Sequence, residues 1–331
     1  MAKPSEIFED LLILHARREP AFIWGAPGVG KSELVAGLAK KLNIGLIDFR
    51  TALRDPTDLK GFPMPDQATK TMKFFRDAEL PTKGKGILFM DELNSAPPTT
   101  QAAAMQLLLP PYAIGDYALP KDWWIVGAGN RESDRGVVHR MPSPLCNRLT
   151  HFDFDVDADN WKRWALDNEQ TAEDIAFIAF RPSLLYTFDP KSTDRAFGTP
   201  RAWVKAFGQR AAATQEASAY RLVSGTVGAG QAAEYFGFLK VIKDVPSVDQ
   251  IKIDPDGTKV PTQPATLHAI TTALSMATTK VSAFSRFMKY VERLPVEFQA
   301  VYVRDAIKNE SDITTSKEFT RWSLKNEAVL L

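Results

Sequence analysis

The sequence predicts an α/β fold built on a parallel sheet and followed by an all-helical region, and three observations support this. Apolar runs typical of buried strands recur in the first half of the chain and alternate with helical patterns. One such run leads into a glycine-rich turn and then a helix, the order that a phosphate-binding loop requires. Beyond this half, helical periodicity continues and no strand-rich stretch follows. We therefore expect two domains, residues 1–157 and residues 158–331.

The composition is that of an ordinary folded protein. The 331 residues are 44% hydrophobic and 24% charged, which is enough apolar material for a sizeable core. The net charge of +1 and the lack of a long basic block argue against a nucleic-acid-coating surface. The single cysteine, Cys146, excludes an internal disulfide and favours an intracellular location.

No segment of the sequence suggests secretion or membrane insertion. The N-terminus lacks the apolar core of a signal peptide, and no apolar run approaches the roughly 18 residues of a membrane span. We therefore expect a cytoplasmic protein with no membrane partner.

The elements of the first domain follow from short apolar runs and from punctuation by glycine and proline. Expected strands are residues 21–24, 44–49, 87–90, 123–129 and 150–156. Expected helices are residues 5–18, with Ser5 as N-cap, 31–42 and 97–109. Residues 50–65 are rich in proline, glycine and aspartate, which predicts a loop with at most a short helical turn. Residues 112–119 predict a β-hairpin around Gly115 and Asp116.

The second domain is expected to be helical throughout. Thr199 and Pro200 open one helix as N-cap and first helical residue. A glycine cluster at residues 225–230 lacks both a preceding strand and a following Gly-Lys-Ser, so we reject it as a nucleotide site. Residues 251–264 predict a long loop, and three further helical runs are expected at residues 265–292, 296–309 and 316–330.

The strongest motif lies between the first strand and the second expected helix. The pattern G-x-x-x-x-G-K-[ST] is matched at every position by Gly25, Ala26, Pro27, Gly28, Val29, Gly30, Lys31 and Ser32. Glycines let backbone N–H groups approach phosphate oxygens, and the positive end of the following helix dipole points at the same anion. Lys31 can reach the β- and γ-phosphates, and the Ser32 hydroxyl can bind Mg²⁺. The alternative is a glycine-rich turn that matches by chance.

Two carboxylates end the third expected strand. Asp91 and Glu92 follow an apolar run long enough for a strand buried on both faces. Open α/β sheets place their ligands at this end of the strands. Asp91 can hold the water shell of Mg²⁺, which leaves Glu92 to orient and activate an attacking water. An acidic strand end that merely faces solvent is the alternative.

Three more residues are candidates. Asn130 ends the fourth expected strand, and its amide would contact both the γ-phosphate and the attacking water if that strand lay between the other two. The residues alone leave this interpretation and a plain turn asparagine equally open. Arg148 by itself resembles a surface arginine. Arg201 occupies a first helical turn, where the dipole disfavours a cation, so either a bound phosphate or a nearby acid should compensate it.

Taken together, the order and spacing of these motifs resemble those of an AAA+ ATPase of the MoxR-like family. The resemblance rests on Gly25–Ser32, Arg54–Gly61, Phe89–Asn94, Gly115–Tyr117, Ala128–Arg131, Asn147–Leu149 and Gly198–Arg201, and it covers residues 5–210 best. It implies a five-stranded parallel sheet, a helical lid, Mg²⁺-dependent ATP hydrolysis and a homo-hexameric ring with nucleotide between neighbours.

The resemblance also implies roles for single residues and a kind of partner. Asn130 corresponds to sensor 1, Arg148 to the arginine finger and Arg201 to the sensor-2 arginine. Arg131 and Arg140 are rival candidates for the finger. The hairpin at residues 111–119 would face the ring pore or a partner.

The function implied by the resemblance is that of a chaperone or remodelling ATPase. Its usual protein partner would carry a von Willebrand factor A domain. A DNA-acting motor subunit and a nucleotide-switched scaffold are the alternatives. The near-neutral charge argues against the motor, and the intact Asp91, Glu92 and Asn130 argue against the scaffold.

Overall fold

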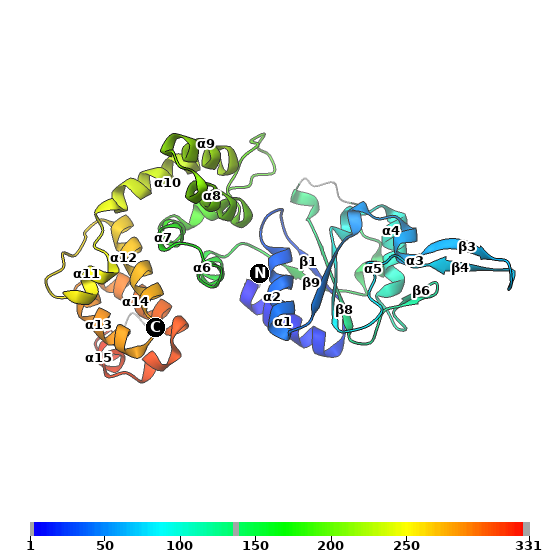
Figure 1. Ribbon diagram of the computed structural model, residues 1–331, viewed down its shortest axis with the longest axis horizontal. Coiled ribbons are helices and arrows are strands. Elements are labelled where there is room, and N and C mark those ends of the chain that lie inside the picture. Colours follow the sequence, from blue (N-terminus) through cyan, green and yellow to red (C-terminus); the bar gives the residue numbers. More distant parts are fainter. Residues whose placement is uncertain (1–2, 135–138, 327–331) are drawn as a thin grey trace. The chain divides into compact units, whose positions relative to one another are not determined.

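The computed structural model describes residues 3–134 and 139–326 and divides into two compact units (Figure 1). The first unit runs to Asp157 and includes Asp189–Ser192; the second takes Ala158–Phe188 and the chain from Thr193 onward. The first unit has mixed helices and strands, and the second is helical in its described part. Among the described residues, no helix is both long enough and apolar enough to span a bilayer.

The first unit alternates strands and helices. In chain order its elements are α1 (Pro4–Arg17), β1 (Ala21–Trp24), α2 (Lys31–Leu42), β2 (Gly45–Arg50), the short 3-10 helix η1 (Thr51–Leu53), α3 (Pro56–Lys60), β3 (Phe62–Asp66), β4 (Thr71–Phe75), β5 (Gly86–Asp91), η2 (Leu93–Ser95), α4 (Pro98–Leu107), β6 (Ala113–Ile114), β7 (Tyr117–Ala118), β8 (Trp123–Gly129), η3 (Glu132–Asp134), α5 (Ser143–Cys146) and β9 (Thr150–Asp153).

The expected five-stranded parallel sheet is confirmed. Its strand order is β2-β5-β8-β1-β9, and every neighbouring pair is parallel. The central strands β5 and β8 are buried almost throughout, as their apolar sequences require. Because the strands are parallel, their carboxyl ends share one edge of the sheet, and β8 places its end between those of β5 and β1.

The expected loop at residues 50–65 is wrong in part. It holds η1, α3 and β3, and β3 pairs with β4 in an antiparallel hairpin that extends away from the main sheet (Figure 1). Pro63 and Pro65 lack N–H groups and therefore argue against a strand. They are tolerated because β3 pairs with β4 alone, so its other edge needs no donor.

Smaller differences concern element ends and caps. The residue at the N-cap of α1 is Lys3, not Ser5, because Pro4 already occupies the first helical position. The Glu6 side chain then accepts a hydrogen bond from the Lys3 backbone N–H at 2.7 Å. The last strand of the sheet ends at Asp153 rather than at residue 156. The hairpin around Gly115 and Asp116 is present as β6 and β7.

The second unit is a series of helices. In chain order they are α6 (Ala158–Asp167), α7 (Ala172–Phe180), η4 (Pro182–Leu185), α8 (Pro200–Ala212), α9 (Glu216–Val227), α10 (Ala229–Val241), η5 (Ile242–Asp244), α11 (Val248–Ile253), α12 (Pro264–Ala277), α13 (Val281–Val291), α14 (Val296–Asn309), η6 (Ser311–Thr315) and α15 (Lys317–Lys325).

Three expectations for this unit need correction. The run 265–292 is two helices, α12 and α13, because the chain leaves helical geometry at Thr278. The expected loop from residue 251 begins only after α11 ends at Ile253. The last helix ends at Lys325, and residues 327–330 of the expected run lie outside the described residues. The Thr199 cap of α8 is confirmed, since its hydroxyl accepts a hydrogen bond from Ala202 N at 3.0 Å.

Candidate nucleotide site

The candidate site lies where three neighbouring strands end. The strand β1 leads into the glycine-rich loop, β5 ends at Asp91, and Asn130 directly follows β8. The register pairs Trp24 of β1 with Gly129 of β8, so the loop begins at the level of Asn130. The topology therefore meets the condition on which the interpretation of Asn130 depended.

The loop has the backbone geometry that its glycines allow. Gly28 and Gly30 have φ values of 75° and 111°, in the left-handed region that favours glycine. Helix α2 begins directly after Gly30, so its first N–H groups lie at the loop. Such an arrangement of amides and a helix N-terminus forms an anion site.

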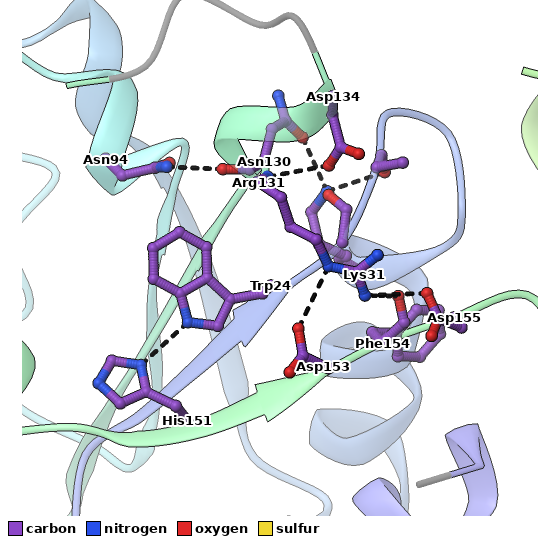
Figure 2. Close-up of polar contacts among 12 residues, drawn as sticks. Trp24, Lys31, Asn94, Asn130, Arg131, Asp134, His151, Asp153, Phe154 and Asp155 are labelled. Atoms are coloured by element: carbon purple, nitrogen blue, oxygen red, sulfur yellow. Dashed lines mark hydrogen bonds and ion pairs between the residues drawn. The ribbon is translucent and has the colours of Figure 1, made fainter. Parts of the chain in front are cut away.

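Lys31 is folded back onto the loop and is almost fully buried. Its ammonium Nζ donates to the carbonyl oxygens of Gly25 and Ala26, at 2.5 and 3.1 Å, and to Asn130 Oδ1 at 3.0 Å. Figure 2 shows Lys31 and Asn130 directed toward each other. These bonds join the loop to the end of β8.

Ser32 and Asp91 also come together. Ser32 Oγ donates to Asp91 Oδ2 at 3.3 Å, and the other carboxylate oxygen accepts from Glu92 N at 2.9 Å. Burial raises the pKa of Asp91, while the hydrogen bond from Glu92 N and the charge of Lys31 oppose this shift. A hydroxyl and a carboxylate are the hard oxygen ligands that Mg²⁺ prefers, so these two residues fit that ion.

Glu92 and Asn94 form the turn that follows β5. Glu92 is exposed and has a φ of 55°, a strained value of the kind that clusters at functional sites. Asn94 is 1% exposed, and its Nδ2 donates to the carbonyl oxygen of Asn130 at 2.7 Å (Figure 2). The sequence motifs assign no role to Asn94. Only its position two residues after the Asp91-Glu92 pair could have indicated one.

The arginine candidates have different surroundings. Arg131 is paired within its own unit, with Asp153 at 3.2 Å and Asp155 at 2.8 Å. Arg148 is half-buried and donates to the carbonyl oxygen of Met105 at 3.3 Å. Arg140 is exposed, with no side-chain partner within the part of the chain that the structure describes.

Arg201 lies in the helical unit, on the first turn of α8, and its side chain is exposed. The structure describes the two units separately, so the site in the first unit is defined without Arg201. Across residues 3–134 and 139–326 there is no cluster of His, Cys, Asp and Glu that could hold a metal by itself. A bound Mg²⁺ would thus depend on the oxygens named above and on its ligand.

Comparison with known proteins places the first unit. Residues 21–154 match the model of the family described as ATPase family associated with various cellular activities (AAA), a segment that spans all five strands of the main sheet. No curated protein matches the chain.

Two solved structures illustrate more distant similarity. A "putative ATPase" from Cytophaga hutchinsonii ATCC 33406 is 14% identical, with a TM-score of 0.36, over 93% of this chain and 81% of that chain. NtrX from Brucella abortus is 15% identical, with a TM-score of 0.32, over 97% of this chain and 67% of that chain. The similarity of this chain to the AAA family of ATPases thus consists of the match of residues 21–154 in the first unit.

Proposed function

We propose that this protein is a Mg²⁺-dependent ATPase of the MoxR-like kind, which works as a homo-hexameric ring to remodel a protein partner. The observation that carries the proposal is that two contacts meet at one edge of the sheet. Lys31 Nζ lies 3.0 Å from Asn130 Oδ1, and Ser32 Oγ lies 3.3 Å from Asp91 Oδ2. The AAA domain supports the ATPase part of the proposal.

Each side chain at the edge has a task in this proposal. The loop amides and Lys31 hold the phosphates of ATP, and Lys31 exchanges its bonds to Gly25 and Ala26 for bonds to phosphate oxygens. Ser32 and Asp91 hold Mg²⁺, which supplies charge neutralisation to the phosphates. Glu92 orients the attacking water, and Asn130 fixes the position of that water against the γ-phosphate.

The ring supplies what one subunit lacks. We propose that Arg148 acts as the arginine finger in the site of a neighbouring subunit, where it stabilises transition-state charge. The contacts of Arg131 with two carboxylates of its own unit favour Arg148 over Arg131 for this task. Arg201, as the sensor-2 arginine, would connect nucleotide state to the helical unit.

The partner is assigned by the resemblance alone. We propose a protein with a von Willebrand factor A domain, bound through the β6–β7 hairpin at residues 113–118. The turn of this hairpin is held from a neighbouring strand, because Asp116 Oδ2 accepts a hydrogen bond from Phe74 N at 3.2 Å.

The first experiment measures phosphate release from ATP by the full chain with and without Mg²⁺. We expect Mg²⁺-dependent turnover that Glu92→Gln abolishes while leaving ATP binding intact. Absence of turnover at every protein concentration, or full turnover by Glu92→Gln, would contradict the assignment.

The second experiment measures the solution mass of Glu92→Gln with and without Mg-ATP. A shift to about six subunits with ATP supports a composite site between subunits. A monomer under both conditions, together with measurable ATP binding, would remove Arg148 from the mechanism and leave a nucleotide-binding switch. A trapped ring would then be used to capture a purified von Willebrand factor A domain, with Lys31→Ala as the control that should form no complex.

A further inference from the structure

The side chain of Arg131 connects the chain just after Asn130 to the end of β9 and the two residues that follow it. Its guanidinium contacts Asp153 Oδ1 through Nε at 3.2 Å and Asp155 Oδ1 through Nη2 at 2.8 Å. The same Nη2 donates to the carbonyl oxygen of Phe154 at 3.4 Å. The Arg131 side chain thus contacts three consecutive residues (Figure 2).

Phe154, the middle residue of the three, also contacts the chain where the phosphate loop begins. Phe154 N donates to the carbonyl oxygen of Trp24 at 2.7 Å, directly before the loop begins. A Cβ added to Gly25 would lie only 2.8 Å from the carbonyl oxygen of Phe154, so the two backbones are packed closely. Any movement of Phe154 therefore acts on the first residues of the loop.

The contacts close a circuit around the site. Lys31 joins Gly25 to Asn130, and Arg131 is covalently next to Asn130. From Arg131 the circuit returns through Phe154 to Trp24 and the start of the loop. Among the side chains in this series of contacts, Arg131 is one to which the proposed function gives no role.

The charge of Arg131 is secure in this position. Burial works against the guanidinium charge, yet the carboxylates of Asp155 and Asp153 outweigh it and raise the pKa of Arg131. Asp153 is the last residue of β9 and Asp155 follows two residues later, at the edge where a polyphosphate would bind, and Arg131 compensates both carboxylates. The planar fork of arginine suits several acceptors at once, which lysine cannot match.

We propose that Arg131 is a positioning residue that ties the backbone of Asn130 to residues 153–155 and thereby fixes the Asn130 amide for ATP hydrolysis. The proposal rests on the proposed ATPase function, and it gives Arg131 a role within its own subunit rather than in a neighbour. The prediction is that loss of the Arg131 contacts lowers kcat more than it weakens nucleotide binding, because Lys31 and the loop amides are not substituted and Phe154 keeps its own hydrogen bond to Trp24.

The test compares Arg131→Gln, the double variant Asp153→Asn/Asp155→Asn, and the triple variant that combines them. Arg17→Gln is the matched control, because Arg17, the last residue of α1, forms an exposed ion pair with Glu19 just after the helix. We expect Arg131→Gln and the double variant each to lower kcat by roughly 10-fold to 100-fold, with the affinity for ADP within about 3-fold of the parent. The triple variant should be no slower than Arg131→Gln, since both changes cut the same tie.

Two results would overturn the proposal. Parental kcat in the double variant with loss of turnover in Arg131→Gln would mean that Arg131 acts directly on nucleotide or in a neighbouring subunit. Equal loss of ADP binding and turnover in Arg131→Gln would mean that it serves the loop and not Asn130.

Hydrogen exchange tests the tie without any dependence on ATP hydrolysis. In nucleotide-free protein, amides in residues 150–156 should exchange about 3-fold to 10-fold faster in Arg131→Gln than in the parent or in Arg17→Gln. Unchanged exchange there would remove the tie itself. If the parent hydrolyses no ATP, the proposed function fails, and the exchange result still decides whether Arg131 holds residues 153–155.

Discussion

Each unit of the protein buries a lysine, and the two lysines are held in opposite ways. Lys31 is 9% exposed and donates to two backbone carbonyls and the amide of Asn130. Lys162 is 6% exposed and forms an ion pair with Asp305, which is 2% exposed. Carbonyl and amide acceptors do not cancel an ammonium charge, whereas a carboxylate does. Lys162 is thus paired with a carboxylate inside the helical unit, whereas Lys31 lies in the glycine-rich loop and its charge also opposes the upward shift of the Asp91 pKa.

The arginines divide in the same way. Arg148 donates to the backbone carbonyl of Met105, like Lys31 to its loop. Arg210 in the helical unit contacts the buried carboxylate of Asp174, and Arg131 contacts two carboxylates. We therefore expect substitution of Lys31 or Arg148 to lower ATP binding or turnover with little change in the free energy of unfolding. Substitution of a cation paired with a carboxylate, such as Lys162 or Arg210, should first lower the free energy of unfolding.

The largest effect is expected for Arg148→Ala. Removal of an arginine finger lowers kcat on the order of 10³-fold to 10⁵-fold, because the positive charge that a neighbouring subunit adds to those of Lys31 and Mg²⁺ in the transition state is then missing. The affinity for ATP and the thermal midpoint should stay near the parental values. Steady-state phosphate release by the assembled protein at saturating ATP measures the effect, and Arg210→Ala is the counterpart.

Arg210→Ala should show the reverse pattern. It leaves Asp174 buried without one of its partners, which costs roughly 2 kcal/mol of folding free energy, while turnover per folded molecule is kept. Full turnover by assembled Arg148→Ala would contradict a catalytic role for Arg148 and would leave it no functional difference from Arg210.

Lys162→Met tests the buried ion pair between Lys162 and Asp305 in the helical unit. Removal of Lys162 takes away the closest partner of the buried Asp305, while Arg304 and Lys308, at 3.5 and 3.6 Å from Oδ1, still compensate part of its charge. The free energy of unfolding should therefore fall by about 1–3 kcal/mol. A second change, Asp305→Leu, should recover most of this loss, because the pair is then replaced by apolar side chains. Urea unfolding of the three proteins measures the recovery. A weaker ATP affinity in the folded fraction of Lys162→Met would contradict its structural role.

Lys31→Met is the matched change in the first unit. The affinity for ATP should fall roughly 100-fold, which is about 2.7 kcal/mol, because the loop loses the only kind of charge it can direct at the β- and γ-phosphates. The free energy of unfolding should stay within about 1 kcal/mol of the parent, since a methionine fills the same volume without desolvating a charge. Calorimetric titration with ATP and urea unfolding of the same samples separate the two quantities.

The sequence predicted the sheet and the loop because both depend on local patterns. Apolar runs located the strands, and the phosphate-loop pattern located the anion site with the strand and helix that flank it. The hairpin β3–β4 escaped prediction because Pro63 and Pro65 suggest a loop, and only the absence of a second neighbour makes them acceptable in β3.

Long-range contacts between polar side chains were beyond the sequence. Arg131 meets Asp153 and Asp155, which are more than 20 residues away in the chain, and nothing in the spacing marks them as partners. Asn94 was part of a recognisable motif, but its orientation toward Asn130 depends on how β5 and β8 lie side by side. The order of strands, rather than any one residue, decides these contacts.

The last expected effect is a change of stability with pH at His268, near the Lys162–Asp305 ion pair of the helical unit. Burial lowers the pKa of His268 from 6.5 to about 4, and the charge of Lys162 adds to this shift. The ring packs edge-on against Phe298, with centroids 5.0 Å apart. Between these two pKa values the unfolded chain binds a proton that the folded chain does not, so stability falls as the pH drops through this window.

His268→Phe keeps the aromatic packing and removes the titration. From about pH 7 to about pH 4.5 the parent should lose roughly 2 kcal/mol more unfolding free energy than His268→Phe, and the exposed carboxylates cancel in the difference. Parallel pH profiles of the two proteins would show that His268 titrates normally. If Asp305 neutralised Lys162 completely, Lys162→Met would leave the His268 pKa unchanged. A rise of that pKa in Lys162→Met, measured by NMR titration, would show that a lysine paired with a carboxylate still acts on its neighbours.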